Sequence, residues 1–91
     1  MPTVRFTANI QRHVACPTLE VGGATVRAVL EAYFAQVPAA RGYVLDDQAR
    51  LRKHMVAFVN GQQVADRDGL ADVIAADAEL DIVQALSGGQ E

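Results

Sequence analysis

The chain of 91 residues has one cysteine, one lysine and no long apolar run. Because the single cysteine, Cys16, has no partner for an internal disulfide, its presence fits a reducing cytoplasm. No stretch approaches the ~18 consecutive apolar residues that indicate a membrane span. The first residues contain no basic stretch followed by an apolar core, so we expect no secretory signal. These absences predict a cytoplasmic protein that does not enter a membrane.

Positive charge is also scarce. Eight Lys and Arg residues stand against eleven Asp and Glu residues, which gives a formal net charge of −3. Nucleic-acid binding requires clustered Lys and Arg side chains that neutralise phosphates, so this composition argues against a nucleic-acid partner. The one basic cluster spans residues 50–54, and we interpret it as a local solvated patch.

The sequence contains no group of residues typical of a catalytic or metal site. One histidine, His13, falls in a loop and the other, His54, just before a strand, and no Cys or His pair has metal-ligand spacing. The adjacent carboxylates at residues 46–47 fall in a polar turn, where solvation is the usual role. Cys16 is interpreted as a small strand or loop residue, and the alternative is a reactive thiol. We therefore expect no enzyme activity, no metal and no cofactor.

The first part of the chain shows two strand patterns and one helix pattern. Apolar residues alternate over residues 3–9 and again over residues 18–21, which predicts two strands that pair as a hairpin. From Thr25 to Val37 the apolar residues recur with helical spacing, and the Thr25 hydroxyl is suited to cap the helix N-terminus. Pro38 ends this helix, because the residue before a proline disfavours the helical conformation.

The second part of the chain is predicted to consist mainly of short strands. Residues 42–45 are interpreted as a short strand. The clearest strand, residues 55–59, ends at Asn60-Gly61, a dipeptide that suits a type I′ hairpin turn because both central residues need positive φ. The remaining predicted elements are a return strand at residues 63–65, a brief helical turn at residues 70–74 and a last strand at residues 79–83.

The order of the main elements, β-β-α-β-β-β, predicts an α+β fold. One amphipathic helix must cover one face of a mixed sheet of four to five strands. The first and last strands are expected to be central and parallel, because a ββα unit followed by returning strands closes most simply that way. This arrangement is the ubiquitin-like β-grasp, with a domain over residues 1–86 and a flexible C-terminal tail over residues 87–91.

The C-terminus holds the main candidate for chemistry, the pair Gly88-Gly89. A fold does not need two glycines after its last strand, whereas a segment without side chains can thread a narrow cleft of another protein. If Gly89 became the terminal residue, its carboxylate could be activated as an acyl-adenylate. The alternative is that the two glycines belong to a frayed end without a function.

Four runs of the sequence form a further pattern. They are Met55-Val56-Ala57-Phe58-Val59-Asn60-Gly61-Gln62-Gln63-Val64, Gly69-Leu70-Ala71-Asp72-Val73-Ile74, Glu79-Leu80-Asp81-Ile82-Val83 and Leu86-Ser87-Gly88-Gly89. Together with the helix at residues 25–37 they resemble the MoaD/ThiS family of ubiquitin-like sulfur carrier proteins over essentially the whole chain. The preceding run at residues 51–54 and the longer middle region are most similar to the branch that donates sulfur to cysteine or to other thio-containing metabolites.

The resemblance implies a carrier whose C-terminal carboxylate is activated by other proteins. An E1-like adenylating enzyme would use ATP to activate Gly89, a sulfurtransferase would convert it to a thiocarboxylate, and a sulfur-accepting synthase would take the sulfur. The tail residues that these enzymes would recognise are Leu86, Ser87 and Gly88. Because Gln90 and Glu91 follow Gly89, a JAMM-type metalloprotease would first have to cleave the bond between Gly89 and Gln90.

The chain departs from the family pattern at two places. Gly89 is not terminal, so the carrier function depends on removal of Gln90-Glu91. Residues 75–78 replace the tight Asp-Gly-Asp turn that usually precedes the last strand. The acidic residues around this turn either steer a basic partner surface or form a solvated rim.

Two other functions are compatible with the same fold. A protein modifier would be activated in the same way and joined through Gly89 to lysines of target proteins. Lys53, the only lysine of the chain, would offer few attachment points for polymeric chains. A β-grasp interaction module without an activated terminus would bind instead through the sheet face around Phe58. In each case we expect a monomer.

Overall fold

A computed structural model describes residues 1–84 of the chain, and residues 85–91 lie outside this description. The helices of the described part are α1 (Ala8–Gln11), α2 (Val26–Gln36) and α3 (Pro38–Val44). Its strands are β1 (Thr3–Phe6), β2 (Leu19–Glu20), β3 (Met55–Val59), β4 (Gln62–Gln63) and β5 (Glu79–Gln84). No helix within residues 1–84 is both long and apolar enough to cross a lipid bilayer.

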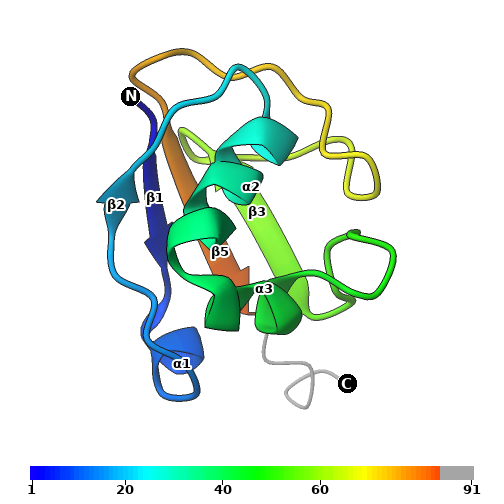
Figure 1. The fold of residues 1–91 in the computed structure, drawn as a ribbon. Helices are drawn as coiled ribbons and strands as arrows, with labels where there is room; N and C mark the ends of the chain where they lie inside the picture. The colour runs from blue at the N-terminus through cyan, green and yellow to red at the C-terminus, as the bar shows by residue number, and fades with distance from the viewer. Residues whose placement is uncertain (85–91) are drawn as a thin grey trace.

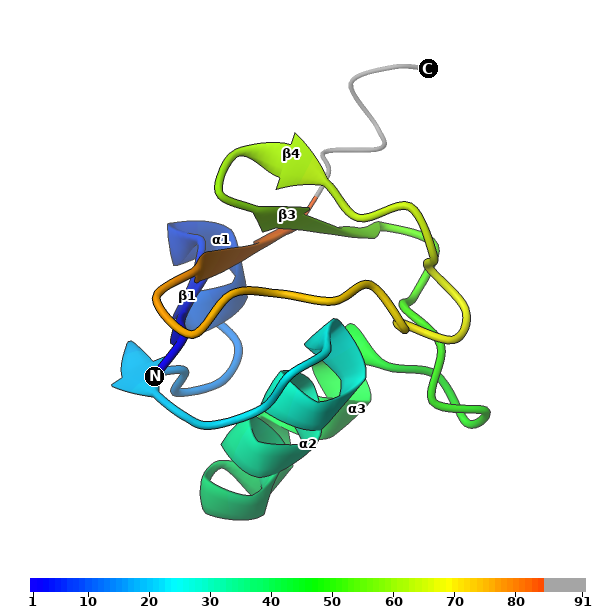
Figure 2. The same ribbon diagram turned by 90° about the horizontal axis from the view of Figure 1, so that it is seen from above.

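The five strands form one mixed sheet with the order β2-β1-β5-β3-β4. Strand β5 runs parallel to β1, and the other three pairs of neighbouring strands are antiparallel. Helices α2 and α3 lie against one face of this sheet, as Figure 1 and Figure 2 show from two directions. The α+β β-grasp prediction is confirmed, including the parallel first and last strands at the centre of the sheet.

The apolar stripe of α2 packs into the core, as its spacing predicts. Its buried side chains are Val26, Val29, Leu30, Tyr33 and Phe34. They share one core cluster with the inward side chains of the central strands, Val4, Phe6, Leu80 and Ile82. The rings of Phe6 and Tyr33 are 4.9 Å apart between centroids, and the Tyr33 hydroxyl donates to the carbonyl of Pro17 at 2.7 Å. Thr25 caps the helix as predicted, because its Oγ1 accepts from the backbone N of Ala28 at 3.1 Å.

The first strand is shorter than its alternating sequence predicts. Strand β1 ends at Phe6, and α1 begins at Ala8 within the range assigned to the strand. The side-chain amide of Gln11 donates to the carbonyl of Phe6 at 3.1 Å, and Ile10 is buried. The short helix therefore turns the chain away at the end of β1 and adds one side chain to the core.

The predicted strand at residues 42–45 is wrong, because most of these residues belong to α3. Pro38 occupies the first turn of α3, where its missing N–H removes no helical hydrogen bond. Ala40 and Val44, four residues apart, are buried, whereas Tyr43 is exposed. The proline therefore ends α2, as predicted, and also starts the next helix.

The predicted helical turn at residues 70–74 is also wrong. Leu70 has a φ of 56°, which lies in the left-handed region and is incompatible with a right-handed helical turn. The segment instead bonds to the start of α2, because the backbone N of Arg27 donates to the carbonyl of Leu70 at 2.8 Å and that of Val26 to the carbonyl of Asp72 at 2.9 Å. Long-range backbone bonds thus replace the local bonds of a helix.

Strand β4 is at an edge of the sheet and is shorter than the return strand predicted at residues 63–65. After it, the carboxylate of Asp72 accepts from the backbone N of Ala65 at 2.9 Å and from that of Asp66 at 3.0 Å. Two backbone donors just after the strand are therefore occupied by a side chain of the same molecule.

The hairpin between β3 and β4 has the predicted turn. Asn60 and Gly61 have φ angles of 50° and 84°, as a type I′ turn requires. The Asn60 side chain also accepts from the backbone N of Glu79 at 2.9 Å, and the backbone N of Asn60 donates to the carbonyl of Glu79 at 2.9 Å. Asn60 therefore ties this hairpin to the first residue of β5.

Replacing Asn60 separates these two roles. Asn60→Ala should lower the free energy of unfolding by about 1–3 kcal/mol, because it loses the side-chain hydrogen bond and puts an alanine at positive φ. Asn60→Gly keeps the backbone conformation and loses only the hydrogen bond, so it should cost roughly 1 kcal/mol. Urea unfolding, followed by circular dichroism, measures the free energy of unfolding of both variants. An equal decrease in the two variants would contradict a role for the backbone conformation of Asn60.

Candidate functional site

The residues that the sequence predicts to carry the chemistry lie outside the described part of the chain. They are Leu86, Ser87, Gly88, Gly89 and Gln90, and their roles stay predictions, as does the domain boundary at residue 86. The structure describes the place where the chain leaves the sheet: β5 ends at Gln84, which is paired with Met55 at the start of β3. The candidate site is therefore built from this end of β5 and the sheet face beside it.

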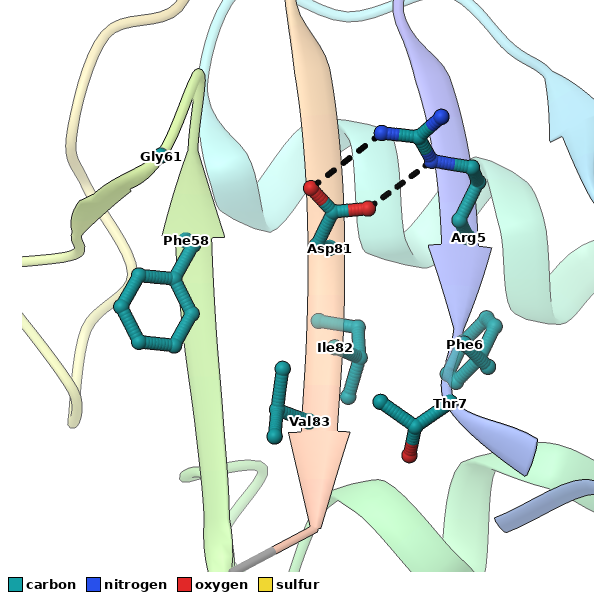
Figure 3. A pocket seen from close by; sticks show the side chains of 8 residues that line it. All are labelled: Arg5, Phe6, Thr7, Phe58, Gly61, Asp81, Ile82 and Val83. Carbon is teal, nitrogen blue, oxygen red and sulfur yellow. Dashed lines mark hydrogen bonds and ion pairs between the residues drawn. The ribbon is translucent and has the colours of Figure 1, made fainter. Parts of the chain in front are cut away.

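The sheet face opposite α2, called here the open face, holds a groove of about 380 Å³. The groove is lined by Arg5, Phe6, Thr7, Phe58, Gly61, Asp81, Ile82 and Val83 (Figure 3). Side chains of a strand point alternately to its two faces. Arg5 lies between the buried Val4 and Phe6 along β1, and Asp81 lies between buried apolar residues of β5 in the same way. The groove therefore follows from the same alternation that builds the core.

The polar side of the groove is an ion cluster. Arg5 Nε lies 2.9 Å from Asp81 Oδ1, and Arg5 Nη2 lies 2.8 Å from Glu79 Oε1. The parallel register of β1 and β5 places Arg5 level with Asp81, so the two side chains face each other (Figure 3). The hydrogen bond and charge of Asp81, with the charge of Glu79, raise the pKa of Arg5. The open face thus presents a fixed, internally paired arginine.

The other side of the groove is mainly apolar. Phe58 on β3 and Val83 on β5 are half-buried on the open face (Figure 3), and Val56 is the strand partner of Val83. Thr7 Oγ1 is buried and has no hydrogen-bond partner among the described residues. An apolar surface beside a paired arginine suits a protein partner that supplies an apolar side chain.

Other polar residues considered in the sequence have structural surroundings. The Asp46 carboxylate accepts from the backbone N of Gln48 at 2.8 Å and of Arg50 at 3.0 Å. These bonds, chiefly that from Arg50, lower the pKa of Asp46, so this carboxylate shapes its turn. The ring of His13 stacks on that of Tyr43 with 6.1 Å between centroids. Within residues 1–84, no group of three or more His, Cys, Asp or Glu side chains is placed to hold a metal ion.

The thiol of Cys16 lies in the core. The residue is 1% exposed, and burial raises the pKa of its thiol, which favours the protonated form. Burial, with the charge of a Cys16 thiolate as a second cause, also raises the pKa of Tyr33 to about 12. The structure therefore supports a packing role for Cys16 over a reactive thiol.

Solved structures with the same architecture are known. The crystal structure of SAMP1 from Haloferax volcanii has a TM-score of 0.77 and 27% identity, and the match covers 97% of this chain and 98% of that chain. CysO of Mycobacterium tuberculosis has a TM-score of 0.79 and 22% identity over 94% and 100% of the two chains. CysO in the BexX/CysO complex of Amycolatopsis orientalis has a TM-score of 0.75 and 22% identity over 98% and 100%. No curated protein matches the chain in sequence.

The mixed five-stranded sheet, the helices on one of its faces and the last strand at its centre define a ubiquitin-like β-grasp protein. The family model described as the ThiS family matches residues 4–89. The chain therefore belongs to the ThiS family, a family of ubiquitin-like sulfur carriers and modifiers. This confirms the resemblance that the four sequence runs indicate.

Sequence reasoning found only part of the open face. Phe58 is predicted as part of a sheet binding face, whereas Arg5, Thr7, Asp81 and Val83 are missed. The outward positions of Arg5 and Asp81 are readable from their apolar neighbours on each strand. The contact between Arg5 and Asp81 cannot be read from the sequence, because it depends on the register of two strands in which these residues are separated by 76 positions.

The burial of Cys16 predicts a slow thiol reaction. In the native protein, Cys16 should react with Ellman's reagent at least about 100-fold more slowly than in urea, because access requires local opening of the core. The matched control is the double variant Cys16→Ala/Val73→Cys, since Val73 is 81% exposed and its replacement should react at once. Equal rates for the native protein and this control would contradict the packing role.

Proposed function

We propose that this chain is a sulfur carrier whose Gly89, after removal of Gln90-Glu91, is adenylated by an E1-like enzyme and converted to a thiocarboxylate. The observation that carries the proposal is the extent of the family match, which runs from residue 4 to residue 89. The match ends at the second glycine of the Gly88-Gly89 pair. The two residues beyond the match are the two that the proposal removes.

The chemistry requires a terminal carboxylate that reaches another protein's active site. In the first step, the Gly89 carboxylate attacks the α-phosphorus of ATP and releases pyrophosphate. In the second step, a sulfide sulfur attacks the carbonyl carbon, the bond to the phosphate oxygen breaks, and AMP leaves the thiocarboxylate. Gly89 lies five residues after Gln84, so an extended chain spans at most roughly 17 Å beyond the sheet. The glycine pair lets the terminal carbonyl pass through a narrow entrance.

The described residues support docking rather than catalysis. Their main concave feature beside β5 is the groove between Arg5, Phe58 and Val83, and protein-binding surfaces combine such apolar centres with polar margins. The carrier is therefore not itself an enzyme in this proposal. It acts in the cytoplasm as a monomer without a cofactor, and the sulfur enters cysteine, siderophore or other thio-metabolite biosynthesis.

The proposed partners carry out the reactions. They are a JAMM-type metalloprotease that cleaves between Gly89 and Gln90, an E1-like adenylating enzyme, and a sulfurtransferase or sulfur-accepting synthase. The BexX/CysO complex supports a protein partner for such a chain, since CysO there has the fold of this chain. In our proposal the open face meets the adenylating enzyme, with Phe58 as the central contact.

Protein modification is the second candidate. The 27% identity to SAMP1 favours it, because SAMP1 is a small archaeal modifier protein. In this case the activated Gly89 carbonyl would be transferred to the amine of a target lysine, and no sulfur acceptor would be needed.

The intact mass of the protein isolated from its native cells under thiol-preserving conditions tests both candidates. The carrier predicts loss of Gln90-Glu91 and a fraction with sulfur in place of one terminal oxygen. Truncation without sulfur, together with branched peptides that end at Gly89 on other proteins, would favour the modifier. A mass that stays full length when the candidate protease is co-expressed would contradict both, and would leave an interaction module.

Substitutions on the open face test its role in docking. With the chain ending at Gly89, Phe58→Asp should weaken binding to the adenylating enzyme at least about tenfold, as expected for a central aromatic contact. Val73→Asp is the matched control, because it changes an exposed apolar residue outside this groove. Isothermal titration calorimetry measures the affinity, and circular dichroism checks that both variants are folded. An equal effect of the two substitutions would rule out the groove as the docking site.

A further inference from the structure

Three cationic residues are brought together before the start of β3, the strand that pairs with the end of β5. Within residues 1–84, the ion pairs engage Arg5, Arg27, Arg41 and Arg50. The Lys and Arg side chains without an acidic partner in that range are Arg12, Arg52, Lys53 and Arg67. The last three form what we call the exit cluster, in which Arg67 Nη2 lies 3.0 Å from the carbonyl oxygen of Arg52.

The backbone holds the two arginines of the exit cluster in place. Arg52 Nε donates to the carbonyl of Gly42 at 2.7 Å, and Arg67 donates to the carbonyl of Arg52. The same Arg52 carbonyl accepts from the backbone N of Met55 at 2.9 Å, where β3 begins. These bonds fix the side chains without neutralising their charge, so part of the entropy cost of binding an anion is already met.

The exit cluster is next to the end of β5. Met55 is the strand partner of Gln84, and Arg52 and Lys53 precede Met55 by three and two residues. The acidic residue Glu79 is at the other end of β5, roughly 17 Å away at ~3.3 Å per residue. A chain with a net charge of −3 therefore presents positive charge at the end of the sheet from which residues 85–91 follow.

The distance along the chain limits what the exit cluster can contact. If residues 85–89 extend into a cleft, the Gly89 carboxylate lies up to roughly 17 Å beyond Gln84. The exit cluster then remains outside, at the entrance of the cleft, and does not reach the phosphates of ATP. A nucleic-acid partner also fits poorly, because the paired carboxylates of Glu79 and Asp81 and the net negative charge would repel it.

We propose that the exit cluster binds a rim of Asp and Glu side chains around the entrance of the cleft that receives the C-terminal residues. This inference rests on the proposed function for the identity of the partner, the adenylating enzyme. Complementary charge at the rim guides the approach and sets the orientation in which the C-terminal residues face the cleft. Such contacts act mainly on the association rate and weaken with salt.

The association rate of the chain ending at Gly89 with its adenylating enzyme, measured by stopped flow at several NaCl concentrations, tests this inference. Lys53→Glu should lower the rate at low salt about threefold or more and reduce its salt dependence. Lys53→Arg should keep the wild-type rate, because it preserves the charge. The matched variants Lys53→Gln and Gln62→Glu each lower the net charge by one, and the change at Gln62, which is exposed at the other end of β3, should have a clearly smaller effect. Equal effects of Lys53→Gln and Gln62→Glu, or no effect of Lys53→Glu, would overturn the inference.

A second measurement keeps this inference separate from the proposed function. A glutamate octapeptide, titrated into the full-length chain and followed by NMR, should shift the backbone amides of Arg52, Lys53 and Arg67, and Lys53→Glu should weaken these shifts. Shifts spread evenly over the molecule, or equal shifts with a thymidine octanucleotide, would contradict an acidic protein rim. Absence of ATP–pyrophosphate exchange with the wild-type chain ending at Gly89 would instead count against the proposed function, whatever the peptide result.

Discussion

The parallel pairing of β1 with β5 is the interaction on which the rest of the structure depends. It joins the first and last strands of the described chain in a register that puts Val4 beside Leu80 and Phe6 beside Ile82. These four apolar side chains then face α2 and form the centre of the core. The same register brings the outward residues of the two strands together on the opposite face. A shift of one residue would exchange the two sets and would bury charge against the helix.

Much of this architecture is predictable from the sequence, because it follows from local periodicity. The alternating residues of β1, β3 and β5 and the apolar stripe of α2 require only the geometry of one element each. The errors occur where distant backbone decides the outcome. Residues 70–74 make backbone hydrogen bonds to the start of α2, not within their own segment. Residues 42–44 are helical because Pro38 starts a new helix. The Arg5–Asp81 contact is of the same kind, since no local pattern sets the strand register.

The described residues and the C-terminal residues have separate tasks in the proposed function. The domain offers a groove, an internally paired ion cluster and a patch of positive charge, all of which address another protein's surface. The reactive atom belongs to Gly89, whose chemistry is that of any terminal carboxylate. Specificity therefore comes from where the domain docks, and the reaction comes from the partner. In this proposal, a domain whose thiol is buried and favours the protonated form needs no reactive cysteine of its own for sulfur transfer.

The side chain of Asp72 bears on whether copies of the chain can associate through the β4 edge of the sheet. An edge strand has unpaired backbone groups to which an identical molecule can add a strand, and repetition of this step leads to aggregation. Strand β4 offers only two residues to such an addition. The amide hydrogen of Val64 bonds to the carbonyl of Ala57, and the two that follow, those of Ala65 and Asp66, point to the Asp72 carboxylate. The Asp72 carboxylate therefore leaves few free donors along this edge on which a second copy of the chain could add a strand.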